Sequence, residues 1–236
     1  MKQIDSLLLI TLLTVCLSLF TEASEARKSH RHEEDYHHGF LNGTSQSQFD
    51  YYLLALSWSP AFCKTKAGHQ PGKNAQCSAN LGFVVHGLWP QNIGKAYPHD
   101  CGPEADVPVQ IAAIALNATP PMPPGDEQLL KHEWTKHGTC TGLNMTEYFT
   151  AIKITAEKIK IPESLKAPQA GMTMDADTIT GAFAAANPGL TPEMIKLEID
   201  SQNQIHAVQI CFSRQLSLQN CPDANIWQSG RFLPFN

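Results

Sequence analysis

The chain has 236 residues and a formal net charge of −5. This length suits one domain with extensions and is enough to bury a single large core. The negative charge excludes a polycation that collects nucleic acid through its overall charge, so a nucleic-acid ligand would have to be held locally, in a cleft.

Residues 1–23 have the pattern of a secretory signal, with a mostly apolar run from Leu7 to Phe20 and small residues after it. The run is shorter than the roughly 20 residues that span a bilayer, so we expect a secreted or periplasmic protein without a membrane anchor. Residues 24–48 are polar, rich in histidine and lack an apolar period. We expect a flexible extension there, with a weak metal-binding tail as the alternative.

The folded domain is expected to span residues 49–236. Residues 51–57 are apolar on both faces, as in a central strand, and residues 81–86 form a second strand that ends at Gly87. His86 then lies at the end of this strand. The segment between them, residues 63–80, contains Gly, Pro and Lys and predicts a loop.

Helices and strands alternate without a regular rhythm through the rest of the chain. Asp126 predicts the start of a helix that ends at Gly138. Strands at residues 194–200 and 205–212 flank a polar turn typical of a hairpin. The class is therefore α+β, a single disulfide-stabilised domain with an antiparallel central sheet flanked by helices. Further helices are expected at residues 107–116, 148–160 and from Asp175 or Asp177 to 187.

The segment from His132 to His137 carries four ionisable side chains at helical spacing. Residues four apart share a helix face, which pairs His132 with Lys136 and Glu133 with His137. Lys136 would disfavour the imidazolium form of His132, whereas Glu133 would favour that of His137 and orient its ring. Histidines tuned apart in this way suit a general acid and a general base. His86 adds a third imidazole from another element.

A zinc hydrolase is the obvious alternative for such a segment. Its motif places two histidines at positions i and i+4 of a helix. Here His132 and His137 are at i and i+5, so a continuous helix would turn their rings roughly 140° apart. We therefore expect no metal and no cofactor.

Two segments carry a resemblance to a known family: His86-Gly-Leu-Trp-Pro and His132-Glu-Trp-Thr-Lys-His-Gly-Thr-Cys. They resemble the signature segments of the T2 family of secreted ribonucleases, and the likeness extends over about residues 49–236. It implies a monomeric endoribonuclease that cleaves single-stranded RNA by transesterification through a 2′,3′-cyclic phosphate, with low base specificity. DNA lacks the 2′-hydroxyl and should not be cut.

The resemblance also implies a role for each ionisable residue. His137 is the general base and His86 the general acid, or the reverse, and His132 holds the phosphate. Lys136 by charge, and Glu133 by hydrogen bonding or protonation, would stabilise the phosphorane.

Base recognition is expected from residues beside these segments. Trp89 and Tyr97 match family positions that stack a base, with core packing as the alternative for each. Gln91 stands where some fungal relatives have Asp, and an amide both donates and accepts, so base preference should differ. Leu129 stands where relatives often have an aromatic residue, which puts the second base subsite in doubt.

Six cysteines remain after the signal, and an even number in an exported chain indicates disulfides. None forms a C-x-x-C pair, which argues against a zinc ribbon or a redox site. By the resemblance, the pairs are Cys63–Cys77, Cys101–Cys140 and Cys211–Cys221. The middle bridge would fix the end of the second segment and steady His137.

Two functions of other classes remain open. A binding or signalling protein on the same fold, with activity lost, would be expected to lack an essential histidine, and this chain keeps all three. A histidine-rich metal-binding protein would rest on residues 30–38 alone.

Overall fold

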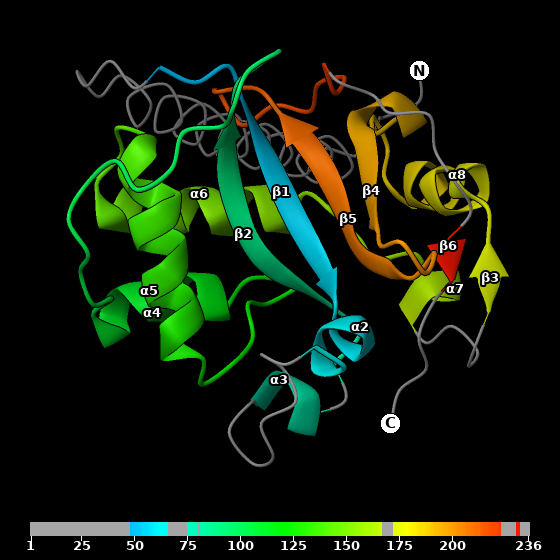
Figure 1. Ribbon diagram of the computed structural model, residues 1–236, viewed down its shortest axis with the longest axis horizontal. Helices are drawn as coiled ribbons and strands as arrows, with labels where there is room; N and C mark the ends of the chain where they lie inside the picture. Colours follow the sequence, from blue (N-terminus) through cyan, green and yellow to red (C-terminus); the bar gives the residue numbers. More distant parts are fainter. Residues whose placement is uncertain (1–47, 66–74, 80, 167–171, 223–229, 232–236) are drawn as a thin grey trace, which may run out of the picture. The chain divides into compact units, whose positions relative to one another are not determined.

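A four-stranded antiparallel sheet with the order β2-β1-β5-β4 lies at the centre of this computed structural model (Figure 1). The structure describes residues 48–65, 75–79, 81–166, 172–222 and 230–231. β1 is flanked on both sides and almost wholly buried, as predicted for a central strand. The strands are β1 (Tyr51–Trp58), β2 (Phe83–Gln91), β4 (Ile195–Ile199) and β5 (Ile205–Phe212).

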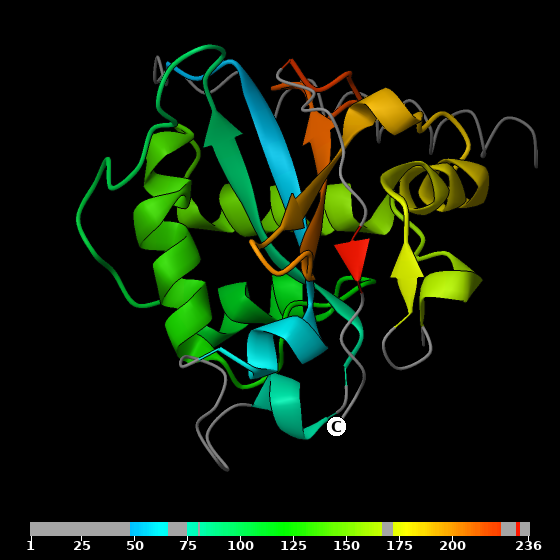
Figure 2. The ribbon, with the colours of Figure 1, turned by 45° about the vertical axis from the view of Figure 1, so that its right-hand side comes forward.

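Helices lie to either side of this sheet, which confirms the α+β class. In Figures 1 and 2, α6 crosses behind the strands, α4 and α5 lie beside β2, and α8 lies beyond β4. The helices are α2 (Ser59–Cys63), α3 (Ala75–Ser78), α4 (Val109–Leu116), α5 (Glu127–Lys136), α6 (Met145–Glu157), α7 (Glu163–Lys166) and α8 (Ala176–Ala186), with 3-10 turns η1 (Gly138–Cys140) and η2 (Pro192–Met194). A small second sheet pairs β3 (Thr173–Met174) with β6 (Gly230–Arg231).

The main core lies between the sheet and α6. Leu54 and Leu56 of β1 and Phe149 and Ile152 of α6 are fully buried. Burying a side chain of this size stabilises the fold by about 1.5–3 kcal/mol. The hydroxyl of Tyr148 in α6 also donates a hydrogen bond to a backbone carbonyl of β2, at 3.1 Å, so α6 holds the strand that carries the first motif.

Side-chain caps begin the two helices α5 and α6. The Asp126 carboxylate accepts a hydrogen bond from the backbone N–H of Leu129 at 2.9 Å, as predicted. Asn144 and Glu147 form a reciprocal capping box at the start of α6. Each cap is worth about 1 kcal/mol. The cap of α5 matters most here because this helix carries the second motif.

The end of β2 differs from the prediction. The strand does not stop at Gly87 but continues to Gln91, and His86 lies within it. Ala55 of β1 pairs with Gly87 while Leu56 pairs with Val85, so His86 is the extra residue of a β-bulge. Because β2 is at the edge of the sheet, it also tolerates a proline.

The end of α5 agrees with the prediction. The last helical residue is Lys136, His137 is the C-cap with φ −116° and ψ −49°, and Gly138 follows as the predicted stop. A Cβ on Gly138 would lie 2.4 Å from a ring atom of Trp134 and 2.9 Å from one of Tyr148. This glycine is therefore required by close packing. A short helix, α3, replaces part of the loop predicted at residues 63–80.

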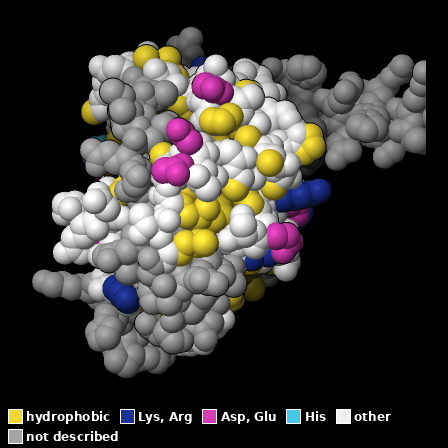
Figure 3. Space-filling model, turned by 90° about the vertical axis from the view of Figure 1, so that its right-hand side faces the viewer, with side chains coloured by type: hydrophobic (Ala, Val, Ile, Leu, Met, Phe, Trp, Pro, Cys, Tyr) yellow, Lys and Arg dark blue, Asp and Glu magenta, His cyan; other side chains and the backbone are white. Residues whose placement is uncertain are grey.

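The predicted signal peptide, residues 1–23, and all but the last residue of the predicted extension lie outside the described residues. Within the described part, each helix falls short of the length and apolar character that a bilayer crossing requires. On the face that α8 covers, hydrophobic and acidic side chains are intermixed (Figure 3).

Candidate active site

The two motifs meet in a cleft of about 460 Å³ at the sheet surface. Seven of the eight predicted catalytic and base-binding residues line this cleft, and Glu133 is buried beside it. Three further lining residues, Leu53, Lys196 and Gln209, were not predicted.

The bulge in β2 aims His86 into the cleft. Side chains alternate across a strand, so a regular β2 would place His86 and Trp89 on opposite faces. The extra residue brings both to the cleft face. There Nδ1 of His86 lies 3.0 Å from the hydroxyl of Ser57, and Nε2 lies 3.3 Å from Oε1 of Glu133. Both ring nitrogens are therefore oriented by neighbours.

Glu133 connects the two motifs from a fully buried position, with 0% of its surface exposed. Its Oε2 accepts a hydrogen bond of 2.9 Å from the indole N–H of Trp89. A Cβ on Gly87 would lie only 1.8 Å from this oxygen. The glycine of the first motif is thus required because the carboxylate occupies the space above it.

The carboxylate of Glu133 is paired with His86, whereas the sequence predicted His137 as its partner. Burial alone would lower the pKa of His86, but the hydrogen bond and charge of Glu133 outweigh it and raise this pKa above the ordinary 6.5. Burial would likewise raise the pKa of Glu133, but His86 holds it below the ordinary value. An imidazolium beside a carboxylate is the favoured state of this pair.

His137 has the opposite tendency. Glu133 does favour its imidazolium, as predicted, but burial outweighs this effect and the net shift of its pKa is downward. His137 is only 4% exposed. This burial lowers its pKa to about 4, against the opposing charge of Glu133 and with help from Lys136. The ring stacks on Trp89 at a centroid distance of 5.2 Å. Its buried Nδ1 has no hydrogen-bond partner among the described residues. His137 is therefore neutral at ordinary pH.

The two histidines of the second motif lie closer together than a continuous helix predicts. Their ring centroids are 6.2 Å apart, and ligand atoms of His132, Glu133 and His137 all lie within 4.8 Å of one another. The predicted divergence of the rings is wrong, and the φ of −116° at His137, the C-cap, departs from the value of a continuous helix. These three residues have the donor types of a cation site. Glu133 is, however, already bonded to His86 and Trp89.

The Cys101–Cys140 disulfide closes the segment that follows His137, with a Cα separation of 4.9 Å. The hydroxyl of Thr139 strengthens this junction because it accepts from the backbone N–H of Cys101 and donates to the carbonyl of Thr135. The cysteines form the three pairs that the resemblance implies; the others are Cys63–Cys77 and Cys211–Cys221.

The predicted base-binding residues differ in how open they are. Trp89 is partly covered, since it stacks on His137 and packs against Leu53. Gln91 lines the cleft, but its amide donates to the adjacent Pro90 carbonyl. Tyr97 is 39% exposed, with its ring centroid 6.1 Å from that of His137. Of the two aromatic residues, Tyr97 offers the more accessible ring.

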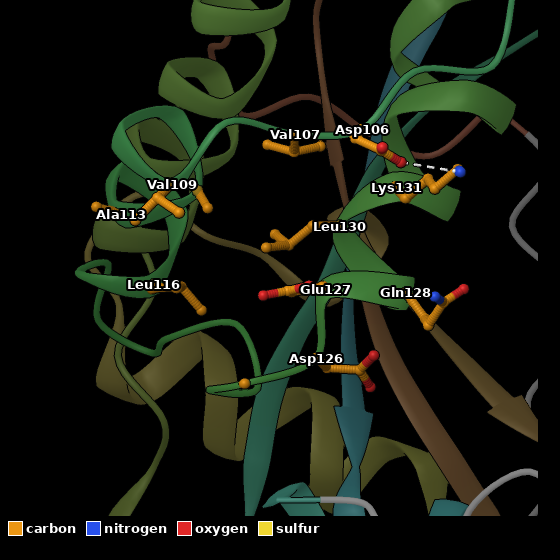
Figure 4. A pocket seen from close by; sticks show the side chains of 12 residues that line it. Asp106, Val107, Val109, Ala113, Leu116, Asp126, Glu127, Gln128, Leu130 and Lys131 are labelled. Carbon is orange, nitrogen blue, oxygen red and sulfur yellow. Dashed lines mark ion pairs between the residues drawn. The ribbon is translucent and has the colours of Figure 1, made fainter.

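A second cavity of about 370 Å³ lies between α4 and α5 (Figure 4). Leu116 and Leu130 face each other across it, and the Lys131 ammonium is neutralised by Glu104 at 2.7 Å and Asp106 at 2.9 Å. None of its described lining residues is a histidine. The cleft is therefore the better candidate for acid–base chemistry.

Comparison with known proteins agrees with this choice. The Ribonuclease T2 family profile matches residues 49–221, which include both motifs. The chain belongs to the ribonuclease T2 family. A protein of Aeromonas hydrophila named Ribonuclease is 44% identical over 43% of this chain and 42% of its own length. A probable ribonuclease of Haemophilus influenzae is 32% identical over 77% of this chain and 64% of its own length.

The chain thus spans less than two thirds of these two relatives. Among solved structures, the RNase-related protein from Calystegia sepium shares the T2 fold. Its TM-score is 0.58 and its identity 28%, over 80% of this chain and 98% of the Calystegia chain.

Proposed function

We propose that this T2 family member is an endoribonuclease that cleaves single-stranded RNA by transesterification. The observation that carries the proposal is the opposite tuning of two imidazoles in one cleft, with the pKa of His86 raised and that of His137 lowered to about 4. Between these two values, one ring holds a proton to give and the other has a lone pair to accept one. This is the pairing that general acid–base catalysis requires.

In the proposed reaction, neutral His137 removes the proton from a ribose 2′-hydroxyl. The 2′-oxygen forms a bond to the adjacent phosphorus, and the bond from phosphorus to the 5′-oxygen of the next nucleotide breaks. Protonated His86 donates its proton to that leaving oxygen. The products are a 2′,3′-cyclic phosphate and a free 5′-hydroxyl, and slow hydrolysis to the 3′-phosphate follows with the two roles exchanged. Each proton transfer contributes about 10²–10⁴-fold.

His132 and Lys136 are proposed to hold the phosphate. Both line the cleft beside His137. Lys136 would offset the charge that builds up on the phosphorane. We assign Glu133 mainly to His86, because its oxygens already contact His86 and Trp89. The contact with Nε2 of His86 is 3.3 Å, longer than the roughly 2.7–2.9 Å of a strong charge-assisted bond, so a leaving oxygen can compete for this proton.

Tyr97 is proposed to stack the base on the 5′ side of the cleaved bond, with Trp89 beneath and Gln91 contacting the base edge. Stacking tolerates any base, which favours low base specificity. DNA should not be cleaved, because the nucleophile is the 2′-hydroxyl. No metal or other cofactor takes part in this scheme.

We also propose that the protein acts as a monomer in a secreted or periplasmic location, after removal of residues 1–23. The three disulfides favour an oxidising compartment. An inactive binding protein on this fold is the weaker alternative, since nothing would then favour the opposite tuning of His86 and His137.

The test is product analysis on a panel of dinucleoside monophosphates in EDTA. We expect each substrate to yield a 2′,3′-cyclic phosphate first, at the same rate with and without the chelator, while the 2′-deoxy analogues stay intact. Loss of cleavage in EDTA would contradict the metal-free scheme, and direct release of a 5′-phosphate would contradict the 2′-hydroxyl as nucleophile.

A further inference from the structure

One row of residues crosses the whole sheet at the level of the catalytic cluster. Gly87 of β2 pairs with Ala55 of β1, Ala55 pairs with Gln209 of β5, and Gln209 pairs with Lys196 of β4. Paired residues of antiparallel strands point to the same face. The row therefore starts beside Glu133 and His86 and ends at a lysine on the edge strand β4.

The row is filled near the catalytic cluster and opens into the cleft at its far end, because Glu133 occupies the space above Gly87 and Ala55 is fully buried. Gly87 and Ala55 carry at most a methyl group, whereas Gln209 and Lys196 have long polar side chains that line the cleft. Three strand spacings separate the backbones of Gly87 and Lys196, which is roughly 14 Å. A nucleotide that extends from His86 through the same cleft would thus place its next phosphate near Gln209 and Lys196.

Lys196 is the cation at this end of the row, and Glu198 lies two residues further along β4. No carboxylate forms an ion pair with Lys196 in the described part of the chain. The nearby acid, Glu198, accepts a hydrogen bond of 3.1 Å from the Gln209 amide. Four other described lysines are in contrast engaged: Lys131, Lys153 and Lys166 in ion pairs and Lys158 with a backbone carbonyl.

We propose that Lys196, with Gln209, binds the RNA phosphate that follows the leaving nucleotide. This inference rests on the proposed ribonuclease function and on His86 as the acid, because the leaving 5′-oxygen then lies on the His86 side of the cleft. The row of paired residues runs from β2, the strand that carries His86, Trp89 and Gln91, across β1 and β5 to Lys196 on β4. The site selects RNA that continues on the 3′ side of the cleaved bond.

The experiment compares the best-cleaved dinucleoside monophosphate with the same compound carrying a 3′-phosphate. In the wild-type protein the added phosphate should lower KM by about threefold to tenfold, as expected for one lysine–phosphate contact. Lys196→Ala should abolish this advantage while leaving kcat and KM for the shorter compound unchanged. Lys196→Arg should retain the advantage, and Lys153→Ala, an exposed lysine of α6, should behave as wild type.

Two results would overturn the inference: an equal loss on both compounds in Lys196→Ala, or an advantage that survives in that variant. As a second readout, the slope of log(kcat/KM) for long RNA against log salt should fall by about 0.7 in Lys196→Ala. Failure of the proposed function itself is distinguishable, because the wild-type protein would then cleave neither compound.

Discussion

Replacing His137 with alanine should lower kcat for RNA cleavage by about 10²–10⁴-fold, the usual contribution of a general base. A neutral imidazole is what the 2′-hydroxyl needs, and burial keeps His137 in that form because it lowers the ring's pKa to about 4. Steady-state kinetics on one defined dinucleoside monophosphate measures the loss.

The control for this variant is His206→Ala. His206 lies on β5, pairs with Asp200 of the preceding turn and does not line the cleft, so its loss should leave kcat within about twofold. Because His137 is buried, folding is checked by thermal unfolding and by binding of an uncleavable 2′-deoxy dinucleotide. A folded His137→Ala protein that binds this ligand and keeps more than about a tenth of wild-type kcat would refute the base assignment.

Glu133→Gln should lower kcat at neutral pH by roughly 10²-fold. Removing the charge takes away what raises the pKa of His86, and burial then lowers this pKa. His86 would therefore be deprotonated at neutral pH and unable to act as acid. The sign of the pH effect follows: activity is lost as pH rises through the pKa of His86, so this alkaline limb moves to lower pH in the variant.

The measurement is the pH profile of kcat/KM for wild type and Glu133→Gln. Glu157→Gln is the matched control, since Glu157 is half-exposed on α6 and pairs with Lys153; its profile should match wild type. A role for Glu133 in folding alone would reduce the amount of active enzyme without moving the alkaline limb. An unmoved limb would therefore exclude the proposed coupling to His86.

The parts of this site that the sequence predicts are those that depend on neighbours along the chain. The Asp126 cap places α5, and helical spacing within α5 brings Glu133 and Lys136 into the region of the cleft. The start of α5 and the spacing of residues along it depend on contacts between residues that are a few positions apart in the chain. The family motifs supply the rest, because they identify His86, His132 and His137 without any knowledge of the fold.

The features of the site that the sequence did not predict depend on contacts between distant segments of the chain. His86 lies on a bulge that only the pairing of β1 with β2 reveals. The pKa of His137 depends on burial by other elements, which outweighs the adjacent Glu133. Side chains of the predicted hairpin point alternately to the two faces of the sheet, but the sequence does not say which face carries the cleft. Only the register of β5 with β1 shows that Gln209, and with it Lys196, faces the cleft.

The most direct test of the central claim is an NMR titration of the imidazole rings of His86 and His137 in the wild-type protein. The two signals are assigned from the single alanine variants. We predict that His137 titrates near pH 4 and His86 above 6.5, so that between these values one ring is neutral and the other protonated. The reverse order, or coincident titration of both rings near 6.5, would contradict the assignment of His137 as base and His86 as acid.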